Sequence, residues 1–151
     1  MQEKRLRMLR EMPLLGGVRN DVLELLLDHA AERSLAPGDV LFTEGEPGET
    51  MYLVESGELE VFRRRHSADY PISRLHTGDC VGEMSFVDLG PRSASVVAAT
   101  DAQVLELTHD TVLQLYQQNL EQFALIQMNM AREMSRRLRL TDDAGCRPTT
   151  L

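Results

Sequence analysis

The chain has no tryptophan and few other aromatic residues, three tyrosines and four phenylalanines. Proteins that bind single-stranded nucleic acid stack bases on aromatic side chains, so this composition argues against nucleic-acid binding. No apolar run approaches the roughly 18 residues of a membrane span, and the charged residues 1–5 are unlike the apolar core of a signal peptide. The two cysteines, Cys80 and Cys146, lie far apart and suit a reducing compartment better than a disulfide framework. These absences predict a cytoplasmic protein that contacts neither membrane nor nucleic acid.

Residues that bind metals or carry out catalysis are also sparse. A metal enzyme built on a rolled sheet needs histidine and carboxylate ligands clustered on facing strands. The four histidines are instead spread over a predicted helix, a loop and two turns, at His29, His66, His76 and His109. No catalytic triad is recognisable. We therefore expect no metal site, no cofactor and no enzymatic activity.

What is present is typical of a soluble globular domain. The chain has 151 residues, 42% of them hydrophobic and 26% charged, which is enough for one domain with a buried core. The formal net charge is -8. Such a protein repels a phosphate at long range, so any bound phosphate must be held by local donors.

The N-terminal part, residues 1–31, is predicted to be helical. Alternating basic and apolar residues over 1–12 indicate a short amphipathic helix that ends at Pro13. A second helix is expected over 22–31, capped by Asn20 or Asp21.

Between Glu32 and Leu107, short apolar runs alternate with glycine turns. Strands are expected at 32–35, 39–43, 50–55, 58–64, 70–76, 80–84, 94–99 and 102–107. Regular short strands of this kind indicate a sandwich or barrel. The turn at 56–57 is predicted to be a hairpin, with Leu59 and Val61 on one face of the following strand.

Two more helices are predicted after the strands, over 112–118, capped by Thr108 or Asp110, and over 120–140. The last helix carries an apolar stripe with helical spacing. Its members are Phe123, Ile126, Met130, Met134 and Leu138, broadened by Leu125, Met128 and Ala131. The stripe fits either packing against its own domain or pairing with a second copy. Residues 1–143 are thus expected to form one domain, and 144–151 a disordered polar tail.

The stretch 82–95, G-E-M-S-F-V-D-L-G-P-R-S-A-S, combines groups suited to a phosphate sugar. Gly82 lets a ligand approach the backbone, and Glu83 is a carboxylate acceptor suited to ribose hydroxyls. Residues 84–87 can open one helical turn, whose N–H groups attract an anion. Arg92 is a planar donor fork that matches phosphate oxygens, and it is the only Lys or Arg between residues 74 and 132.

This stretch resembles the phosphate-binding cassette of the cyclic nucleotide-binding domain family. The family pattern, G-E followed several residues later by R-[ST or A]-A, is intact here. L-x-P-G-D-V-L-F-x-E-G, Y-L-V-x-S-G-E-L and T-G-D extend the resemblance over roughly residues 14–140. It implies an α+β, mainly β fold: an eight-stranded antiparallel β-roll, jelly-roll-like, over 32–107. N-terminal helices and a long C-terminal helix, within 108–140, would flank it.

The resemblance also implies roles for individual residues. Glu83 would bind the ribose 2′-hydroxyl, and Arg92 the exocyclic phosphate oxygens. Backbone or small side-chain contacts would come from Gly82, Met84, Ser85, Ser93 and Ala94. Apolar residues of the roll are expected to sandwich the sugar and base, namely Val61, Ile72, Leu75 and Val81. The last helix would close over the purine through Arg136, Arg137 or Thr141.

The expected function is that of an allosteric switch that binds cAMP in preference to cGMP and acts on an unknown effector protein. Pairing of two copies through the last helix, to form a homodimer, is one expected assembly. The alternative is a non-catalytic dimerisation or docking domain with an unused pocket. Because Arg92 is expected to contact only the ligand, it should contribute little to the unliganded fold.

Overall fold

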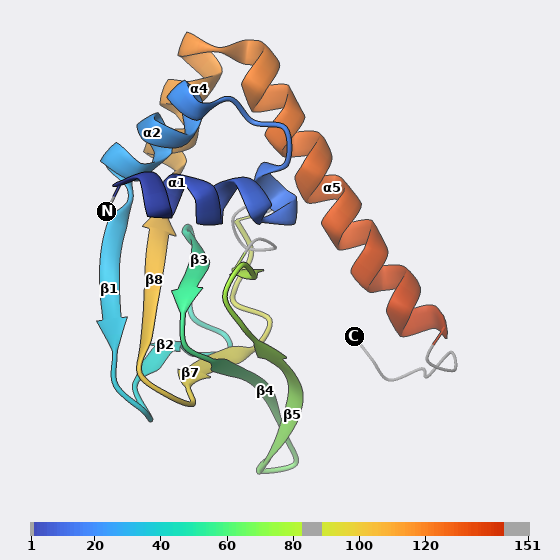
Figure 1. Cartoon of the computed structure of the whole chain (residues 1–151). Helices are drawn as coiled ribbons and strands as arrows, with labels where there is room; N and C mark the ends of the chain where they lie inside the picture. Colours follow the sequence, from blue (N-terminus) through green and yellow to red (C-terminus); the bar gives the residue numbers. More distant parts are fainter. Residues whose placement is uncertain (1, 83–88, 144–151) are drawn as a thin grey trace.

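The computed structural model describes residues 2–82 and 89–143, with a group of helices packed against one side and one end of a rolled sheet (Figure 1). In chain order, the elements are α1 (Gln2–Glu11), the 3-10 helix η1 (Pro13–Leu15), α2 (Asn20–His29), β1 (Ala31–Leu35), β2 (Val40–Phe42), β3 (Met51–Ser56), β4 (Leu59–Arg65), β5 (Ala68–Leu75), β6 (Cys80–Val81), β7 (Ser95–Ala98), β8 (Ala102–Leu107), α4 (His109–Gln118) and α5 (Leu120–Asp143). In this part of the chain, no helix has the length and apolar character needed to cross a membrane.

The strands form two four-stranded sheets in the orders β1-β8-β3-β6 and β2-β7-β4-β5. All recorded strand pairs are antiparallel. The predicted α+β, mainly β fold with an eight-stranded antiparallel roll is therefore confirmed. Each predicted strand overlaps an observed one, because the glycine turns between them were read correctly.

The predicted hairpin at residues 56–57 is wrong, because β3 and β4 belong to different sheets. Gly57 has φ +84°, and a Cβ there would lie 2.7 Å from Ala102 Cα. The turn therefore packs against the chain before β8 and carries the backbone from one sheet to the other. The predicted faces of β4 are confirmed, since Leu59 and Val61 are buried.

The sheet β1-β8-β3-β6 separates two apolar cores. Met51 and Leu53 of β3 belong to a core shared with the helices. Tyr52 and Val54, on the opposite face of the same strand, belong to the core inside the roll. This arrangement explains why β3 is buried on both faces.

The helix boundaries differ from expectation at α2. Its N-cap is Arg19, which makes no side-chain cap hydrogen bond, so neither Asn20 nor Asp21 caps it. Asp21 lies in the first turn and forms an ion pair with Arg19 at 2.6 Å. The hydrogen bond from Arg19 lowers the pKa of Asp21. At α4 the prediction of Thr108 is confirmed, because its side chain accepts from the Thr111 N–H.

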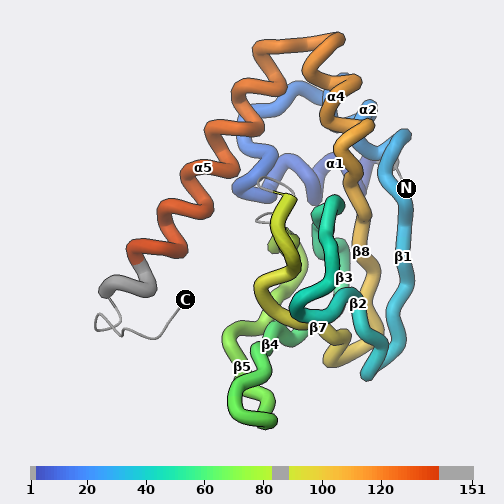
Figure 2. The backbone as a smooth tube through the Cα atoms, turned by 180° about the vertical axis from the view of Figure 1, so that it is seen from behind, coloured from blue at the N-terminus to red at the C-terminus, as the bar shows by residue number. Residues whose placement is uncertain are grey.

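The apolar stripe of α5 packs mainly against its own domain. Met130 is buried in the helical core, and Phe123, Ile126 and Met134 pack against that core. Met128 and Leu138 are 56% and 54% exposed. The C-terminal half of α5 leaves the other helices and runs beside the roll (Figures 1 and 2).

A polar anchor fixes the position of α5. Asn129 is only 5% exposed, and its Nδ2 donates to the carbonyl oxygens of Leu14 and Gly16, each at 3.0 Å. The sequence pattern gave no signal for this residue, because an asparagine beside an apolar stripe resembles any polar position. The contact joins α5 to the loop around η1.

Asn129→Ala should lower the free energy of unfolding by about 1–3 kcal/mol, because two largely buried carbonyl oxygens lose their donor. For a domain of this size, Tm should fall by roughly 2–12 °C. Ser135→Ala, at an exposed position on the same helix, serves as the control and should stay within about 0.5 kcal/mol of wild type. Equal melting of the two variants would show that the anchor adds no stability.

Candidate functional site

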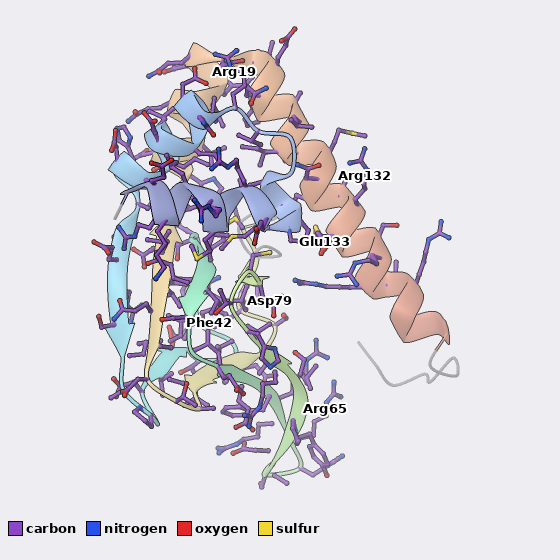
Figure 3. All side chains as sticks on the ribbon, in the orientation of Figure 1. Arg19, Phe42, Arg65, Asp79, Arg132 and Glu133 are labelled. Atoms are coloured by element: carbon purple, nitrogen blue, oxygen red, sulfur yellow. The ribbon has the colours of Figure 1, made fainter. Side chains whose placement is uncertain are left out.

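A cavity of about 620 Å³ lies between the wall of the roll and α5. Its size is within the range of about 300–1,000 Å³ that is usual for small-molecule sites. The roll contributes residues from β4, β5, β6 and the segment around Arg92, and α5 contributes Glu133, Arg136 and Arg137. Figure 3 labels Glu133 on α5 and Asp79 in the turn before β6, which both line this cavity.

The cavity brings together the predicted site residues that the structure describes. They are Val61, Ile72, Leu75, Val81, Gly82, Arg92, Ser93 and Ala94. Glu83, Met84 and Ser85 lie outside the described residues, as does the helical turn predicted over 84–87. Two residues proposed to close over the base, Arg136 and Arg137, also line the cavity, whereas the side chain of Thr141 is outside the described part.

Ile72 owes its position to an irregularity in β5. Val61 pairs with Ser73, and Phe62 pairs with Pro71, so Ile72 is an extra residue on the β5 side of the ladder. Such a bulge bends the strand and re-aims the side chains beside it. β5 is also an edge strand, which is where a proline within a strand is tolerated.

Arg92 is a buried, hydrogen-bonded side chain of the cavity wall. It is 5% exposed. Its Nη1 donates to the carbonyl oxygen of Thr50 at 2.9 Å and to that of Gly82 at 3.4 Å. Its Nη2 donates to the Thr50 hydroxyl at 3.1 Å. The guanidinium carbon lies 4.1 Å from the centre of the Phe42 ring, a cation–π contact.

Two glycines leave room for this guanidinium. A Cβ on Gly48 would lie 2.6 Å from Arg92 Cζ, and a Cβ on Gly82 would lie 2.7 Å from Arg92 Nη1. Real Cβ atoms are not found this close to other heavy atoms. Gly82 also has φ +86°, a conformation that disfavours other residues.

The loop before β3 holds the Arg92 backbone. The N–H of Arg92 donates to the Glu46 carbonyl at 2.8 Å, and the N–H of Gly45 donates to the Arg92 carbonyl at 2.9 Å. Pro47 and Pro91 form an isolated bridge. The glycines of this loop were predicted only as turn residues, and the space that Gly48 leaves for the Arg92 side chain was not predicted.

The contacts of Arg92 correct one expectation. The expectation that Arg92 contacts only the ligand is wrong, because the buried guanidinium donates hydrogen bonds to Thr50 and Gly82. Burial lowers its pKa from the usual value, since desolvation disfavours the charged form. Its Nε has no hydrogen-bond partner among the described residues. A buried, charged donor lacking a partner suits an anionic ligand.

On the opposite wall, α5 touches the strand that leads into residue 82. Nη2 of Arg137 donates to the carbonyl oxygen of Cys80 at 3.3 Å. Nη2 of Arg136 donates to Glu133 at 3.0 Å. The last helix therefore contributes both charge signs to the cavity. No group of three or more His, Cys, Asp and Glu side chains in the described ranges could hold a metal ion.

Comparisons with known proteins agree with this geometry. The model of the family described as "Cyclic nucleotide-binding domain" matches residues 32–119. The chain is 34% identical over 131 residues to the cyclic AMP receptor protein of Thermus thermophilus, covering 86% of this chain and 59% of that protein. It is 36% identical over 102 residues to a cAMP-dependent protein kinase regulatory subunit of Aspergillus fumigatus, covering 68% of this chain and 24% of that protein.

Solved structures show the same fold. The Thermus thermophilus catabolite activator protein has a TM-score of 0.77 at 34% identity, with coverage of 86% of this chain and 60% of that one. A cyclic nucleotide-binding domain from Methylobacillus flagellatus has a TM-score of 0.85 at 26% identity, with coverage of 99% and 84%. The chain thus spans less than two thirds of the named regulators that it matches. Since the family model spans more than half of the chain, and the cavity holds the arginine of the family motif, the chain belongs to the cyclic nucleotide-binding domain family.

Proposed function

We propose that the cavity binds a 3′,5′-cyclic nucleotide, cAMP in preference to cGMP, and that the chain is a non-catalytic regulatory module that acts on a partner protein. The observation that carries the proposal is the buried Arg92 guanidinium, whose Nε has no partner among the described residues. A cyclic phosphate carries one negative charge and two exocyclic oxygens, which suit a planar donor fork.

The rest of the ligand fits the remaining lining. Val61, Leu75 and Val81 supply apolar surface for the sugar and base, and the re-aimed Ile72 extends it. Ala94 keeps the wall beside Arg92 uncrowded, and Gly82 lets the backbone approach. By the family resemblance, Glu83 takes the ribose 2′-hydroxyl, and Met84 and Ser85 add contacts.

The preference for cAMP is supported by the relatives. A cyclic AMP receptor protein and cAMP-dependent kinase regulatory subunits are among the proteins to which the chain is similar. Ser93, which follows Arg92 in the chain, also lines the cavity and is compatible with either purine.

The proposed output passes through α5. The helix lines the cavity with Glu133, Arg136 and Arg137, so a ligand that contacts it shifts its population toward one arrangement. Exposed apolar side chains on α5, at Leu120, Met128 and Leu138, suit an interface with a second copy or with the effector.

Thermal melting tests binding directly. cAMP at about 100 times Kd should stabilise the protein by about 2.7 kcal/mol, a rise in Tm of roughly 5–11 °C. AMP, which lacks the cyclic phosphodiester, is the control and should shift Tm far less at the same concentration. A docking domain with an unused pocket would instead melt at one temperature with every nucleotide.

Arg92→Lys should weaken cAMP binding about tenfold or more, because an ammonium cannot reproduce the planar fork. Without ligand, the free energy of unfolding should also fall by about 1–3 kcal/mol, since the paired contacts to Thr50 and the face of Phe42 are lost. Calorimetric titration and denaturant melts measure both effects. Arg65→Lys, the same change at the exposed end of β4, should match wild type in each. Wild-type affinity in Arg92→Lys would remove Arg92 from the site.

Gly48→Ala should displace the Arg92 guanidinium, because the new Cβ would overlap it. We expect a loss of cAMP affinity of about tenfold or more, equivalent to one charge-assisted hydrogen bond. Gly16→Ala is the matched control, since a Cβ there would lie 3.6 Å from the Pro13 carbonyl oxygen, an ordinary contact. If both variants bind cAMP like wild type, the spacing of the loop does not position Arg92.

A further inference from the structure

A single residue, Thr50, holds both terminal nitrogens of the Arg92 guanidinium. The Thr50 carbonyl oxygen accepts from Nη1 at 2.9 Å, and the Thr50 hydroxyl accepts from Nη2 at 3.1 Å. A guanidinium is planar, and its five N–H donors point in fixed directions. Contacts at the end of the fork therefore fix the plane of the group, with Nε and the second Nη2 hydrogen together on its side edge. Because Nε has no partner among the described residues, this side edge is the part of the fork suited to two phosphate oxygens.

The Thr50 hydroxyl is itself oriented by Tyr52. The two residues are two apart around the start of β3, so their side chains point to the same face. Thr50 Oγ1 donates to the Tyr52 hydroxyl oxygen at 3.2 Å. A threonine hydroxyl has one rotating hydrogen, and it accepts from a cation only when that hydrogen points elsewhere. Since the hydrogen is directed at Tyr52, the lone pairs face Nη2 of Arg92.

Tyr52 is fixed by its ring and by its hydroxyl. It is only 4% exposed, and its ring stacks on that of Phe42, with the two centroids 6.0 Å apart. On the side away from Thr50, Arg33 of β1 donates to the Tyr52 hydroxyl at 3.4 Å. Hydrogen bonds thus connect β1 to Arg92 through Tyr52 and Thr50.

The core of the roll does not require the Tyr52 hydroxyl. The ring belongs to an apolar cluster with Leu41, Val54 and Val104, where a phenylalanine would supply the same packing surface. The recorded hydrogen bonds of the hydroxyl are those to Thr50 and Arg33. What the hydroxyl adds to the ring is therefore the orientation of the groups that lead to Arg92.

We propose that Thr50 and Tyr52 are positioning residues of the nucleotide site, which hold the Arg92 fork with its side edge toward the cyclic phosphate. This inference rests on the proposed function. Neither residue lines the cavity, so both act through Arg92 rather than by touching the ligand. Their effect on affinity consequently requires the fork to be present.

Tyr52→Phe removes only the hydroxyl. Calorimetric titration of the full chain with cAMP should show affinity weakened about three- to tenfold, as expected for one net hydrogen bond. In an Arg92→Lys background, which lacks the planar fork, the same change should alter affinity less than about twofold, because the two effects are not independent. Tyr70→Phe is the matched control, since it removes a hydroxyl at a 50% exposed position on β5, and it should match wild type.

Thr50 supplies a second set of variants. Thr50→Val keeps the size of the side chain and should weaken cAMP binding about tenfold or more, because Nη2 of Arg92 and the Tyr52 hydroxyl both lose a partner. Thr50→Ser retains the hydroxyl and should stay within about threefold of wild type. Tyr52→Phe added to Thr50→Val should cause no further loss, since the hydroxyl that Tyr52 orients is already absent.

Three outcomes overturn the assignment. Equal losses from Tyr52→Phe with Arg92 and with Lys at position 92 would mean that the hydroxyl supports the fold in general. Equal losses from Thr50→Val and Thr50→Ser would assign the effect to packing. Wild-type affinity in both Tyr52→Phe and Thr50→Val would exclude any positioning role. A wild-type chain that does not bind cAMP would instead remove the proposed function itself.

Discussion

The rest of the structure depends on keeping one positive charge buried. Removing a guanidinium from water is costly unless it is hydrogen-bonded and paired. At Arg92 the carbonyl oxygens of Thr50 and Gly82 and the ring of Phe42 offset part of that cost. Thr50 lies just before β3 and Gly82 just after β6, two strands that pair within one sheet, whereas Phe42 ends β2 in the other sheet. The roll brings the two sheets together at Arg92. The fold therefore supplies a donor that is already oriented before a ligand arrives, which reduces the entropy lost on binding.

The same region offers a short physical connection between the cavity and α5. The Gly82 carbonyl accepts from Arg92, and two residues earlier the Cys80 carbonyl accepts from Arg137 of α5. A ligand that draws on the donors of Arg92 acts on a strand segment that α5 also contacts. Asn129 holds the middle of α5 against the η1 loop. A displacement of the backbone at Cys80 would therefore act mainly on the C-terminal half of the helix, which contacts Cys80 through Arg137. Under the proposed switch, that half is the element with two arrangements.

Local sequence patterns predicted the positions of the helices and strands well. They predicted contacts between residues distant in the sequence poorly. The eight strands were found because glycine turns and two-residue alternation are local signals, and Thr108 was found because its capping contact spans three residues. Arg19 was missed as an N-cap, since it supplies no capping side chain. The turn at Gly57 was misread as a hairpin because sheet membership depends on partners elsewhere in the chain.

In the candidate site, too, local motifs were predicted and contacts between distant residues were not. The G-E and R-S-A pattern located Arg92 and its neighbours, and the wall residues Val61, Leu75 and Val81 followed from the positions of the strands. The contacts of Arg92 within the protein could not be predicted from the sequence, because Thr50, Phe42 and Gly48 are distant from it along the chain. Asn129 could not be predicted for a related reason, because its role depends on the carbonyl oxygens of Leu14 and Gly16, which are distant from it along the chain.

A net charge of -8 is compatible with the proposed anionic ligand, because repulsion by the acidic surface and attraction by the cavity arginines act over different distances. At physiological salt, interactions between exposed charges are largely screened beyond about 8 Å, so the acidic surface has little effect once the ligand is inside the cavity. Among the described lining residues, the arginines, at positions 63, 74, 92, 136 and 137, outnumber the carboxylates, at 79 and 133. The local excess is positive although the protein is acidic. The acidic surface disfavours indiscriminate binding of polyanions, and only an anion small enough to enter reaches the buried guanidinium. Under the proposed function, the excess of arginines selects the sign of the ligand's charge, and the cavity volume of about 620 Å³ limits the ligand's size.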